Sequence, residues 1–499
     1  MNKILTTAQM READFYTING LGIESQTLME RAGKALFEKA LQIVGNGNAL
    51  CVCGGGNNGG DGFICARLLR VSGIETDVVC VAERFSSDGQ TAMGKYLSCG
   101  GVLLKEFPKK AYSLVIDCLL GTGFKGELSG VYKNAIERIN GYKTQGAKVL
   151  SADIPSGVNG DNGRVSAVSV NADYTVCLGE YKAGVFLGDG IDCAGEISRA
   201  DIGISLLNET YAQLIDREYV KELLPKRKRN SHKGSYGKAA IVAGSLAYTG
   251  AGYLSTLACL RSGAGYTTLF TPKGVLPYYI LRAPEALIKP LCDGEYPQFD
   301  ESVFENLLAY DSIAYGMGMG ATKGVAQGVE YLLKNYQGKL VLDADALNSM
   351  VLFTDVNQIF QNKQCDVVLT PHLREFSRLC NLAEEDILQA GMYAPNEFSK
   401  EKGVGVYLKN AVSILTDGQR TYLNQTGNSG QAKGGSGDVL SGVIAGLCAQ
   451  GLSAFDGALV GGYIVGKAAE IASLKRGEYS LLASDIIDTL GEAFLSVIE

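Results

Sequence analysis

Histidine is nearly absent from this sequence, and its cysteines are not paired as they are in metal sites. Only 2 of 499 residues are histidine, and the 13 cysteines include no Cys-x-x-Cys pair. Zinc sites are built from such residues at close spacing. The sequence therefore argues against a zinc enzyme. Residues 1–216 contain no histidine, so a carboxylate is the best acid–base candidate there.

Long apolar runs and low-complexity tracts are missing as well. No apolar stretch reaches the ~18 residues that a membrane-spanning helix needs, and residues 1–10 lack the charged-then-apolar pattern of a signal peptide. A net charge of −7 argues against a general nucleic-acid binder. We therefore expect a cytoplasmic protein with reduced, buried thiols that acts on small molecules, with neither nucleic acid nor a membrane as partner.

The chain does have the length and apolar content of two domains. With 499 residues, 46% of them hydrophobic, it exceeds the size at which one core usually keeps growing. Near residues 210–235 the pattern is interrupted where Pro225 precedes four cations, at positions 226–229. A charged run is usually a solvated linker, and guidance of an anionic nucleotide is the alternative. We expect domains at residues 1–216 and 217–499.

Short β-branched runs alternate with helical stretches in both halves. This alternation predicts an α/β protein with mainly parallel sheets covered by helices on both faces. Ligands of such folds bind at the carboxyl ends of strands. Strands are expected near Leu50 and at residues 77–81, 114–117, 148–153, 174–178, 239–243, 267–270, 312–315, 340–342, 367–370, 404–408 and 413–416.

The run Gly434-Gly435-Ser436-Gly437-Asp438 is the strongest functional signal. The apolar residues 439–447 after it predict a helix. Glycines let the backbone approach a ligand closely, and the positive end of the helix favours an anion. Asp438 is placed to take a proton from a neighbouring hydroxyl. The pattern is typical of a phosphoryl-transfer or elimination site, and a glycine turn capped by an aspartate is the alternative.

A second glycine-rich loop, residues 54–62, lies between a predicted strand at 49–53 and a predicted helix at 63–71. This order of elements favours phosphate binding, although the spacing matches neither the dinucleotide fingerprint nor the Walker loop. The sequence thus indicates one anion-binding site in each half.

Oxygen-bearing side chains follow three predicted strands of the first half. Asn58, Asp117 and Ser156 stand there, and neutral oxygens with one carboxylate can hold a hard cation. Both a monovalent ion and magnesium fit this set. Asp117 as a turn residue and Ser156 as a helix N-cap are the structural alternatives. Asp153 is the best acid–base candidate of this half.

These motifs resemble two enzyme families. LMERAG, GGGNNGGDG, DCLLGTGFKGE and DIPSGV are similar to motifs of the NAD(P)H-hydrate epimerases. KGSYG, VAGSLAYTGAGYLS, LRSGAG, DADALN, TPHLREF and GGSGDVLSG are similar to motifs of the ADP- or ATP-dependent NAD(P)H-hydrate dehydratases. In this order they resemble the fused nicotinamide nucleotide repair enzymes over nearly the whole chain. The resemblance implies a Rossmann-like three-layer domain followed by a ribokinase-like α/β domain, and a homo-oligomer.

The resemblance also implies roles for residues of the first domain. Potassium would be held by Asn58, Asp117 and Ser156, and Asp153 would be the catalytic residue. The hydrated dinucleotide would contact both loops and Asp153, namely Asn57, Asn58, Gly59, Gly60, Asp61, Gly121, Thr122, Gly123, Phe124, Lys125, Gly126, Glu127 and Asp153.

In the second domain the resemblance implies that Asp438 is the catalytic base. The hydrate would contact Ala251, Gly318, His372 and Asp438, although a proline-flanked histidine can also be structural. ADP or ATP, with magnesium, would contact Lys409, Asn410, Ala411, Val412, Ser413 and Gly437. The chain departs from the family pattern at Arg374, Asn410 and Lys433; Arg374 and Lys433 are expected to add positive charge near the phosphate site.

The implied activity is the repair of hydrated NADH and NADPH, which carry a hydroxyl at C6 of the nicotinamide ring. The second domain would phosphorylate the S hydrate with ADP and eliminate phosphate, releasing AMP. The first would interconvert the R and S epimers. The preference between ADP and ATP stays open. A sugar or vitamin kinase, which leaves phosphate on its product, and a nucleotide-binding regulator, which does not need Asp438, are the alternatives.

Overall fold

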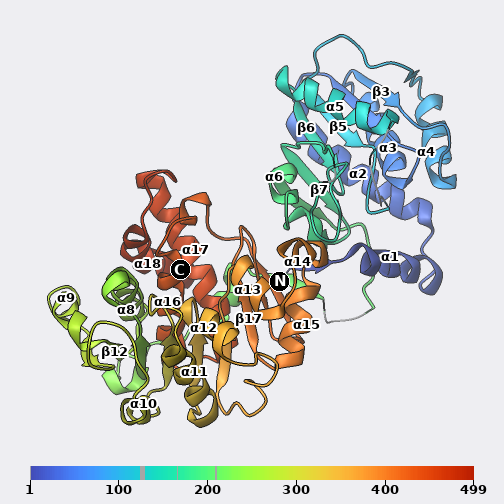
Figure 1. Ribbon diagram of the computed structural model, residues 1–499. Coiled ribbons are helices and arrows are strands. Elements are labelled where there is room, and N and C mark those ends of the chain that lie inside the picture. The colour runs from blue at the N-terminus through green and yellow to red at the C-terminus, as the bar shows by residue number, and fades with distance from the viewer. Residues whose placement is uncertain (1, 124–127, 129, 166, 208–210) are drawn as a thin grey trace. The chain divides into compact units, whose positions relative to one another are not determined.

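The chain forms two compact units, Asn2–Tyr211 and Ala212–Glu499, in a computed structural model (Figure 1). The structure describes residues 2–123, 128, 130–165, 167–207 and 211–499. The cationic segment around Arg227 lies within the second unit, where its guanidinium stacks 3.7 Å from the ring centre of Tyr236 and donates to the carbonyl of Gly263. This segment is therefore not the link between the units.

A seven-stranded parallel sheet forms the centre of the first unit. The strand order is β4 (Leu103–Leu104), β3 (Thr76–Cys80), β2 (Ala49–Cys53), β5 (Leu114–Cys118), β6 (Lys148–Ala152), β7 (Tyr174–Leu178) and β9 (Glu196–Ala200). The order of connection reverses between β2 and β5. In open parallel sheets such a switch point opens a crevice at the carboxyl ends of the strands, where ligands bind.

Helices cover both faces of this sheet. Cys51 and Cys53 of β2 pack with α2 (Ser25–Val44), α3 (Asn57–Val71) and α4 (Ser87–Ser98), whereas Leu50 and Val52 pack with α5 (Gly130–Thr144). Successive residues of a strand point to opposite faces, so one strand supplies two cores. The result is the expected Rossmann-like three-layer arrangement.

A further helix and a short strand pair lie outside these three layers. β1 (Asn2–Leu5) pairs in parallel with β8 (Tyr181–Lys182). α1 (Thr7–Phe15) begins at a capping box, in which the Thr6 side chain accepts from the Gln9 N–H and Gln9 accepts from the Thr6 N–H. A capping box fixes where a helix starts. α1 continues into one π-helical turn, η1 (Tyr16–Gly20), and α6 (Gly190–Ala194) follows β8.

The second unit contains a larger, mainly parallel sheet. Its strand order is β13 (Leu287–Pro290), β12 (Tyr266–Thr271), β11 (Lys238–Val242), β14 (Ser312–Tyr315), β15 (Lys339–Leu342), β16 (Asp366–Leu369), β17 (Gly405–Leu408), β18 (Ser413–Thr416), β19 (Thr421–Asn424) and β10 (Ala212–Leu214). β18 runs antiparallel to both of its neighbours.

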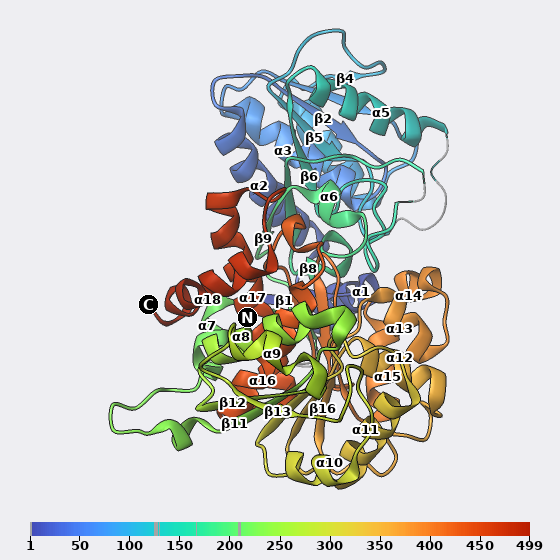
Figure 2. The ribbon, with the colours of Figure 1, turned by 60° about the vertical axis from the view of Figure 1, so that its left-hand side comes forward.

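The two faces of the second sheet carry different sets of helices (Figure 2). α7 (Arg217–Leu223), α8 (Thr249–Arg261), α16 (Ser436–Ala449), α17 (Ala454–Arg476) and α18 (Ala483–Ile498) share a core with inward residues such as Ala314. α10 (Glu301–Leu307) packs its Phe304 on the neighbouring Tyr315, on the opposite face, with α11 (Lys323–Asn335) beside it. α9 (Leu276–Ile280), α12 (Asp345–Phe353), α13 (Leu373–Cys380), α14 (Glu384–Ala390) and α15 (Tyr393–Lys402) complete this unit.

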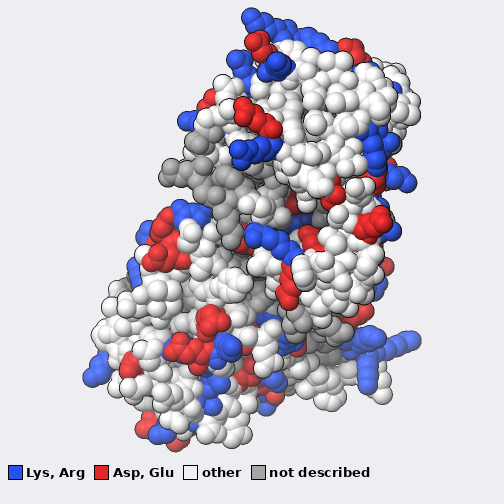
Figure 3. Space-filling view, turned by 90° about the vertical axis from the view of Figure 1, so that its right-hand side faces the viewer, with Lys and Arg blue, Asp and Glu red and all other residues white. Residues whose placement is uncertain are grey.

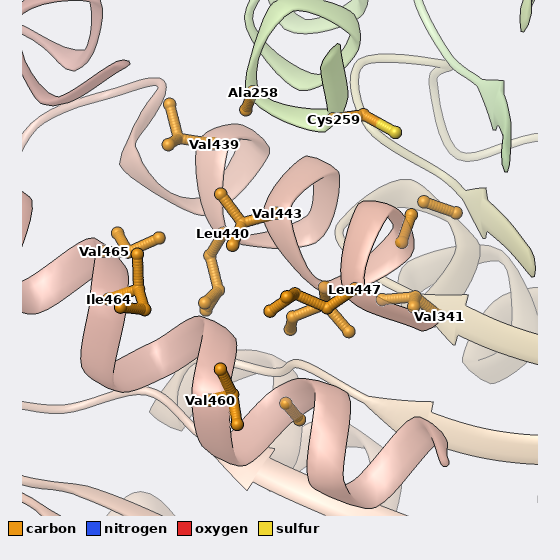
Figure 4. Packing of buried hydrophobic residues seen from close by; sticks show 14 of the residues in the cluster. Ala258, Cys259, Val341, Val439, Leu440, Val443, Leu447, Val460, Ile464 and Val465 are labelled. Atoms are coloured by element: carbon orange, nitrogen blue, oxygen red, sulfur yellow. The ribbon is translucent and has the colours of Figure 1, made fainter. Parts of the chain in front are cut away.

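Helix α16 is enclosed by protein along nearly its whole length. Every residue from 439 to 449 is buried, and Figure 4 shows Leu440 pointing towards α17, which carries Val460 and Ile464. On the side of α8 the two backbones meet, because a Cβ on Gly442 would lie 2.1 Å from the Ser255 carbonyl oxygen. The packing therefore fixes the position of the amino end of α16, where the glycine-rich run lies.

All the strands expected from the sequence are present within a few residues of their predicted positions. The unpredicted strands are short or lie towards the sheet edges: β1, β4, β8, β9, β10, β13 and β19. One helix start was wrong, because α3 begins at Asn57 and not at residue 63. Gly59, Gly60 and Gly62 therefore lie within the helix. Close packing leaves no room for a larger residue there: a Cβ on Gly59 would lie 2.0 Å from the Gly54 carbonyl oxygen.

Acidic and basic side chains are interspersed on the face shown in Figure 3. Among the described residues, no helix has both the length and the apolar character needed to cross a membrane.

The contact between α8 and α16 predicts opposite effects for two glycine substitutions in the second unit. Gly442→Ala should lower its free energy of unfolding by about 1–3 kcal/mol, because the added methyl meets backbone. Gly491→Ala, on α18 with open space around the added atom, should raise it by about 0.5–1 kcal/mol. Calorimetric unfolding of the full chain measures both. Equal effects would show that the helices can move apart.

Candidate active sites

A cavity of about 750 Å³ opens in the first unit at the carboxyl ends of β2 and β5. Its walls come from α1, α2, the start of α3 and the loops after β5 and β6. The predicted residues that line it are Asn57, Asn58, Asp61, Gly121, Thr122, Gly123 and Asp153. Gly59 and Gly60 instead pack against Gly54 and Met29. Phe124, Lys125, Gly126 and Glu127 lie outside the described residues.

The three residues expected to hold a cation meet around the main chain of Leu120. The Asn58 amide donates to the Leu120 carbonyl at 2.9 Å, and the Leu120 N–H donates to the Ser156 hydroxyl at 2.9 Å. That hydroxyl donates to the Asp117 carboxylate at 2.6 Å. Side chains far apart in the sequence thus form one connected group.

This group has an unusual unsatisfied atom. The Asn58 amide nitrogen donates to two carbonyls, of Leu120 and Ala152, while its buried Oδ1 has no hydrogen-bond partner among the described residues. A buried oxygen without a partner costs free energy unless an ion or donor meets it. Asp117 is fully buried beside it, and burial raises the pKa of its carboxyl although Ser156 and other donors oppose this. The donor set fits one monovalent cation.

Asp153 is held in a specific conformation by a buried lysine. Its backbone φ is +70°, a region that few non-glycine residues occupy. Its Oδ1 accepts from the Leu178 N–H and from the ammonium group of Lys182, which is 1% exposed. A buried charge is stable only when it is paired. Asp153 and Lys182 therefore form one ion pair in the wall of the cavity.

Two further carboxyls in the same cavity have no such close cation within the part of the chain that the structure describes. Burial raises the pKa of Asp14, on α1, to about 6, with Lys182 opposing the shift and Asp153 adding to it. Burial also raises the pKa of Asp61 well above its usual range, and the charge of Asp153 adds to the effect. Carboxyls in one site whose pKa values are pushed apart are typical of acid–base catalysis.

In the second unit, Asp438 lies in the first turn of α16, as the sequence predicted. Burial raises the pKa of its carboxyl to about 7; Asp343 adds to the shift and Lys409 opposes it. Gly435, just before the helix, has a φ of +101°, which glycine adopts without strain. The glycine run thus delivers a protonatable carboxyl to the positive end of a buried helix.

Asp343 and Lys409 form a similar ion pair, in which Asp343 is buried and Lys409 is partly exposed. The Lys409 ammonium donates to Asp343 Oδ1 at 2.8 Å, and the Ser441 hydroxyl donates to Oδ2 at 2.7 Å. Burial alone would lower the pKa of Lys409, but Asp343 and Glu375 raise it above its ordinary value. A Cβ on Gly437 would lie 3.3 Å from the Lys409 amine. Two of the predicted nucleotide-binding residues are therefore neighbours.

His372 is both the N-cap of α13 and a neighbour of Lys409 in the sheet. Its Nδ1 accepts from the Glu375 N–H at 3.2 Å, and its main chain bridges to Lys409. Glu375 is buried, and burial raises its pKa while Lys409 lowers it. The structural alternative for His372 is thus satisfied; its side chain is half exposed, and its Nε2 lies 3.4 Å from Glu375 Oε1.

The other predicted residues occupy two further places. Ala251 and Gly318 touch, because a Cβ on Gly318 would lie 2.7 Å from that of Ala251. Asn410, Ala411, Val412 and Ser413 form the turn between β17 and β18, closed by hydrogen bonds between Asn410 and Ser413.

The expected extra cations are engaged elsewhere. Arg374 pairs with Glu384, at 3.4 Å. The Lys433 ammonium donates to the carbonyls of Tyr479 and Leu481. Both thus have protein partners.

Sequence reasoning missed four charged residues of these sites. Asp343 and Asp345 follow β15 in the motif DADALN, so the signal that selected Asp117, a carboxylate after a strand, also marked them. Asp345 accepts from the Gly320 N–H at 2.7 Å. Asp14 and Lys182 had no such signal, because they reach the cavity from elements outside the three layers.

The comparisons with known proteins agree with this geometry. Residues 239–492 match the profile of the NAD(P)H-hydrate dehydratase family, and residues 25–184 match that of the YjeF-related protein N-terminus. The bifunctional NAD(P)H-hydrate repair enzyme of Thermofilum pendens is 32% identical, over 100% of this chain and 97% of its own length.

Two solved structures resemble the second unit. The ADP/ATP-dependent NAD(P)H-hydrate dehydratase of Bacillus subtilis, co-crystallised with ATP and Mg²⁺, is 28% identical with a TM-score of 0.51, covering 57% of this chain and 99% of its own. A ribokinase-like superfamily protein of Enterococcus faecalis is 25% identical with a TM-score of 0.50, covering 59% and 98%. The expected ribokinase-like fold is confirmed. With both profiles matched in order and a relative aligned end to end, the chain belongs to the family of bifunctional NAD(P)H-hydrate repair enzymes.

Proposed function

We propose that this chain repairs hydrated NADH and NADPH in two separate sites. The first unit interconverts the R and S hydrates, and the second dehydrates the S hydrate with ADP, releasing AMP and phosphate. The observation that carries the proposal is Asp438: a carboxyl with a pKa of about 7 at the amino end of a buried helix. We further propose that the chain acts in the cytoplasm as a homo-oligomer.

Asp438 acts as the base on the C6 hydroxyl. Its raised pKa makes it a stronger base than an exposed aspartate and leaves much of it ionised at neutral pH. The phosphoryl group then bears charge next to the backbone N–H groups of α16 and the Lys409 ammonium, which stabilise it. Phosphate is a better leaving group than hydroxide, so elimination restores the ring double bond. The product is free phosphate, which distinguishes this activity from a kinase.

Magnesium would enter with the nucleotide. Among the described residues, no group of three His, Cys, Asp or Glu side chains is arranged to hold a metal ion. Mg²⁺ commonly binds through one or two carboxylates together with substrate phosphates. Asp345 is the carboxylate near this helix end that fits the role, since Asp438 is the base and Asp343 already accepts from Lys409 and Ser441.

In the first unit, potassium would be held by Asn58, Asp117 and Ser156. The unpartnered Oδ1 of Asn58 and the single buried carboxylate support this choice. When bound, the ion would lend positive charge next to the loop after β5. Asp153 exchanges a proton with the hydrate, and Lys182 orients its carboxylate through a hydrogen bond. The glycine-rich amino end of α3 binds the dinucleotide phosphates.

Replacing Asp438 tests the dehydratase assignment. Asp438→Asn should lower dehydration of the S hydrate ~10²–10⁴-fold, because an amide cannot act as base, and leave epimerisation unchanged. In the wild type the dehydration rate should fall as the pH drops below about 7, where Asp438 takes up a proton. NADH absorbance and free phosphate measure the reaction. Asp488→Asn, on the exposed face of α18, is the matched control. Near wild-type dehydration by Asp438→Asn would contradict the assignment.

Potassium dependence tests the cation site. Epimerisation by the full chain should rise when potassium replaces a bulky organic cation, and Asp117→Asn should reduce it at least about tenfold because the charge facing the ion is lost. Dehydration by the same variant should not change. A crystal soaked in thallium should show anomalous density beside Asn58 Oδ1. Ordered water there, with no anomalous signal, would remove the ion from the site.

Dividing the chain tests whether the two activities are independent. Residues 1–211 should epimerise and residues 212–499 should dehydrate, because each unit has its own core. A shorter fragment, 217–499, begins at the boundary expected from the sequence but lacks β10, which pairs with β19. It should melt at a lower temperature than 212–499 yet keep its activity. Fragments that fold but are active only when rejoined would contradict the proposal.

A further inference from the structure

The cavity of the first unit has one wall that comes from outside its three layers. Met10, Arg11, Asp14 and Ile18 line it from α1 and η1. The Arg11 guanidinium donates to the Thr122 carbonyl at 3.2 Å, which ties this helix to the loop after β5. Thr17, on the π-helical turn, accepts from the Ser205 N–H at 2.9 Å. π-helical turns inside helices are frequent at functional sites.

Asp14 is the carboxyl that this wall presents to the cavity. It faces the Asp153–Lys182 pair and Asp61. The charge of Asp153 raises the pKa of Asp14 and that of Lys182 lowers it, while the charge of Asp14 raises the pKa of Asp61. The same helix, α1, also places the Arg11 side chain at the cavity wall. The remaining titratable groups of the cavity wall are Asp88 and Tyr132. Asp153 has the Lys182 ammonium and a main-chain N–H as donors. Asp14 and Asp153 thus line one cavity but have different neighbours.

Epimerisation at C6 needs two proton transfers. C6 bears a hydroxyl and the ring nitrogen N1, so it is a hemiaminal carbon. When a base removes the hydroxyl proton, the O–H electron pair forms a C=O bond, and the C6–N1 bond breaks with its electron pair going to N1, which an acid protonates. The resulting aldehyde turns about C5–C6. Reclosure of N1 on the opposite face returns both protons, so no atom or electron is gained or lost.

We propose that Asp14 is the second proton-transfer residue of the epimerase site, acting on the opposite side of the reacting bond from Asp153. Asp153, paired with Lys182, is the base, and Asp14 is the acid that protonates N1. Two carboxyls with different surroundings in one site are a recurrent solution for such chemistry. Burial raises the pKa of Asp14 to about 6, so a larger share of it is protonated near neutral pH than of an exposed aspartate. This inference rests on the epimerase function proposed above.

Substitutions at Asp14 in the full chain test the proposal. The assay follows conversion of the purified R hydrate of NADH to the S hydrate by chromatography, in potassium and without nucleotide so that dehydration cannot proceed. Asp14→Asn and Asp14→Ala should lower the enzymatic rate ~10²–10⁴-fold. Asp14→Glu should retain more activity than either. Formate, a small carboxylic acid, should restore the rate of Asp14→Ala at least about tenfold. Glu12→Gln, exposed on the same helix, should match the wild type.

The outcomes separate this proposal from the function on which it rests. If the wild type converts the hydrate no faster than the spontaneous reaction, the epimerase function of the first unit is wrong. If the wild type is active but Asp14→Asn stays within about threefold of it, the role of Asp14 is wrong. Loss of activity in Asp14→Ala without rescue by formate, with an unchanged melting temperature, also overturns the role, because Asp14 then acts only by position.

Discussion

In each unit a lysine pairs with a buried aspartate that follows a strand, and the surrounding site depends on that pair. Lys182 meets Asp153 in the first unit, and Lys409 meets Asp343 in the second. One cation satisfies one carboxylate, and further acidic groups lie nearby. Burial raises the pKa values of Asp14, Asp61 and Asp438, and the charge of the neighbouring paired aspartate adds to each shift. The two units, with different sheet orders, arrive at the same electrostatic arrangement.

The glycine-rich segments look alike in the sequence but act for different reasons. Before α16, Gly435 provides a left-handed backbone that the turn into the helix requires. In α3, Gly59 and Gly62 are small because neighbouring backbone and side chains leave no room for a Cβ. Both solutions bring a helix end close to a ligand site. A glycine count alone cannot separate a turn from a tightly packed helix, and the predicted start of α3 was wrong for that reason.

Strand ends and glycine runs leave local signals, and from these the sequence predicted the central strands, their mainly parallel arrangement and Asn58, Asp117, Asp153 and Asp438 as residues at strand or helix ends. Lys409 was implied only by the family resemblance. The sequence did not predict Lys182 or Asp14. Lys182 belongs to a two-residue strand whose pairing with β1 is visible only in three dimensions, and Asp14 looks like any exposed-face residue of an amphipathic helix. The expectation of extra cations at Arg374 and Lys433 also depended on spatial partners, which turned out to be Glu384 and main-chain carbonyls.

The raised pKa of Asp438 links ligand binding to the exchange of protons with solvent. A ligand that places a metal ion next to this carboxyl lowers its pKa and drives a proton out, whereas a phosphate placed there without its metal draws one in. The affinity of the site for these two forms must therefore change with pH in opposite directions. In this way the buried carboxyl makes the site discriminate between nucleotide with its metal and nucleotide without it.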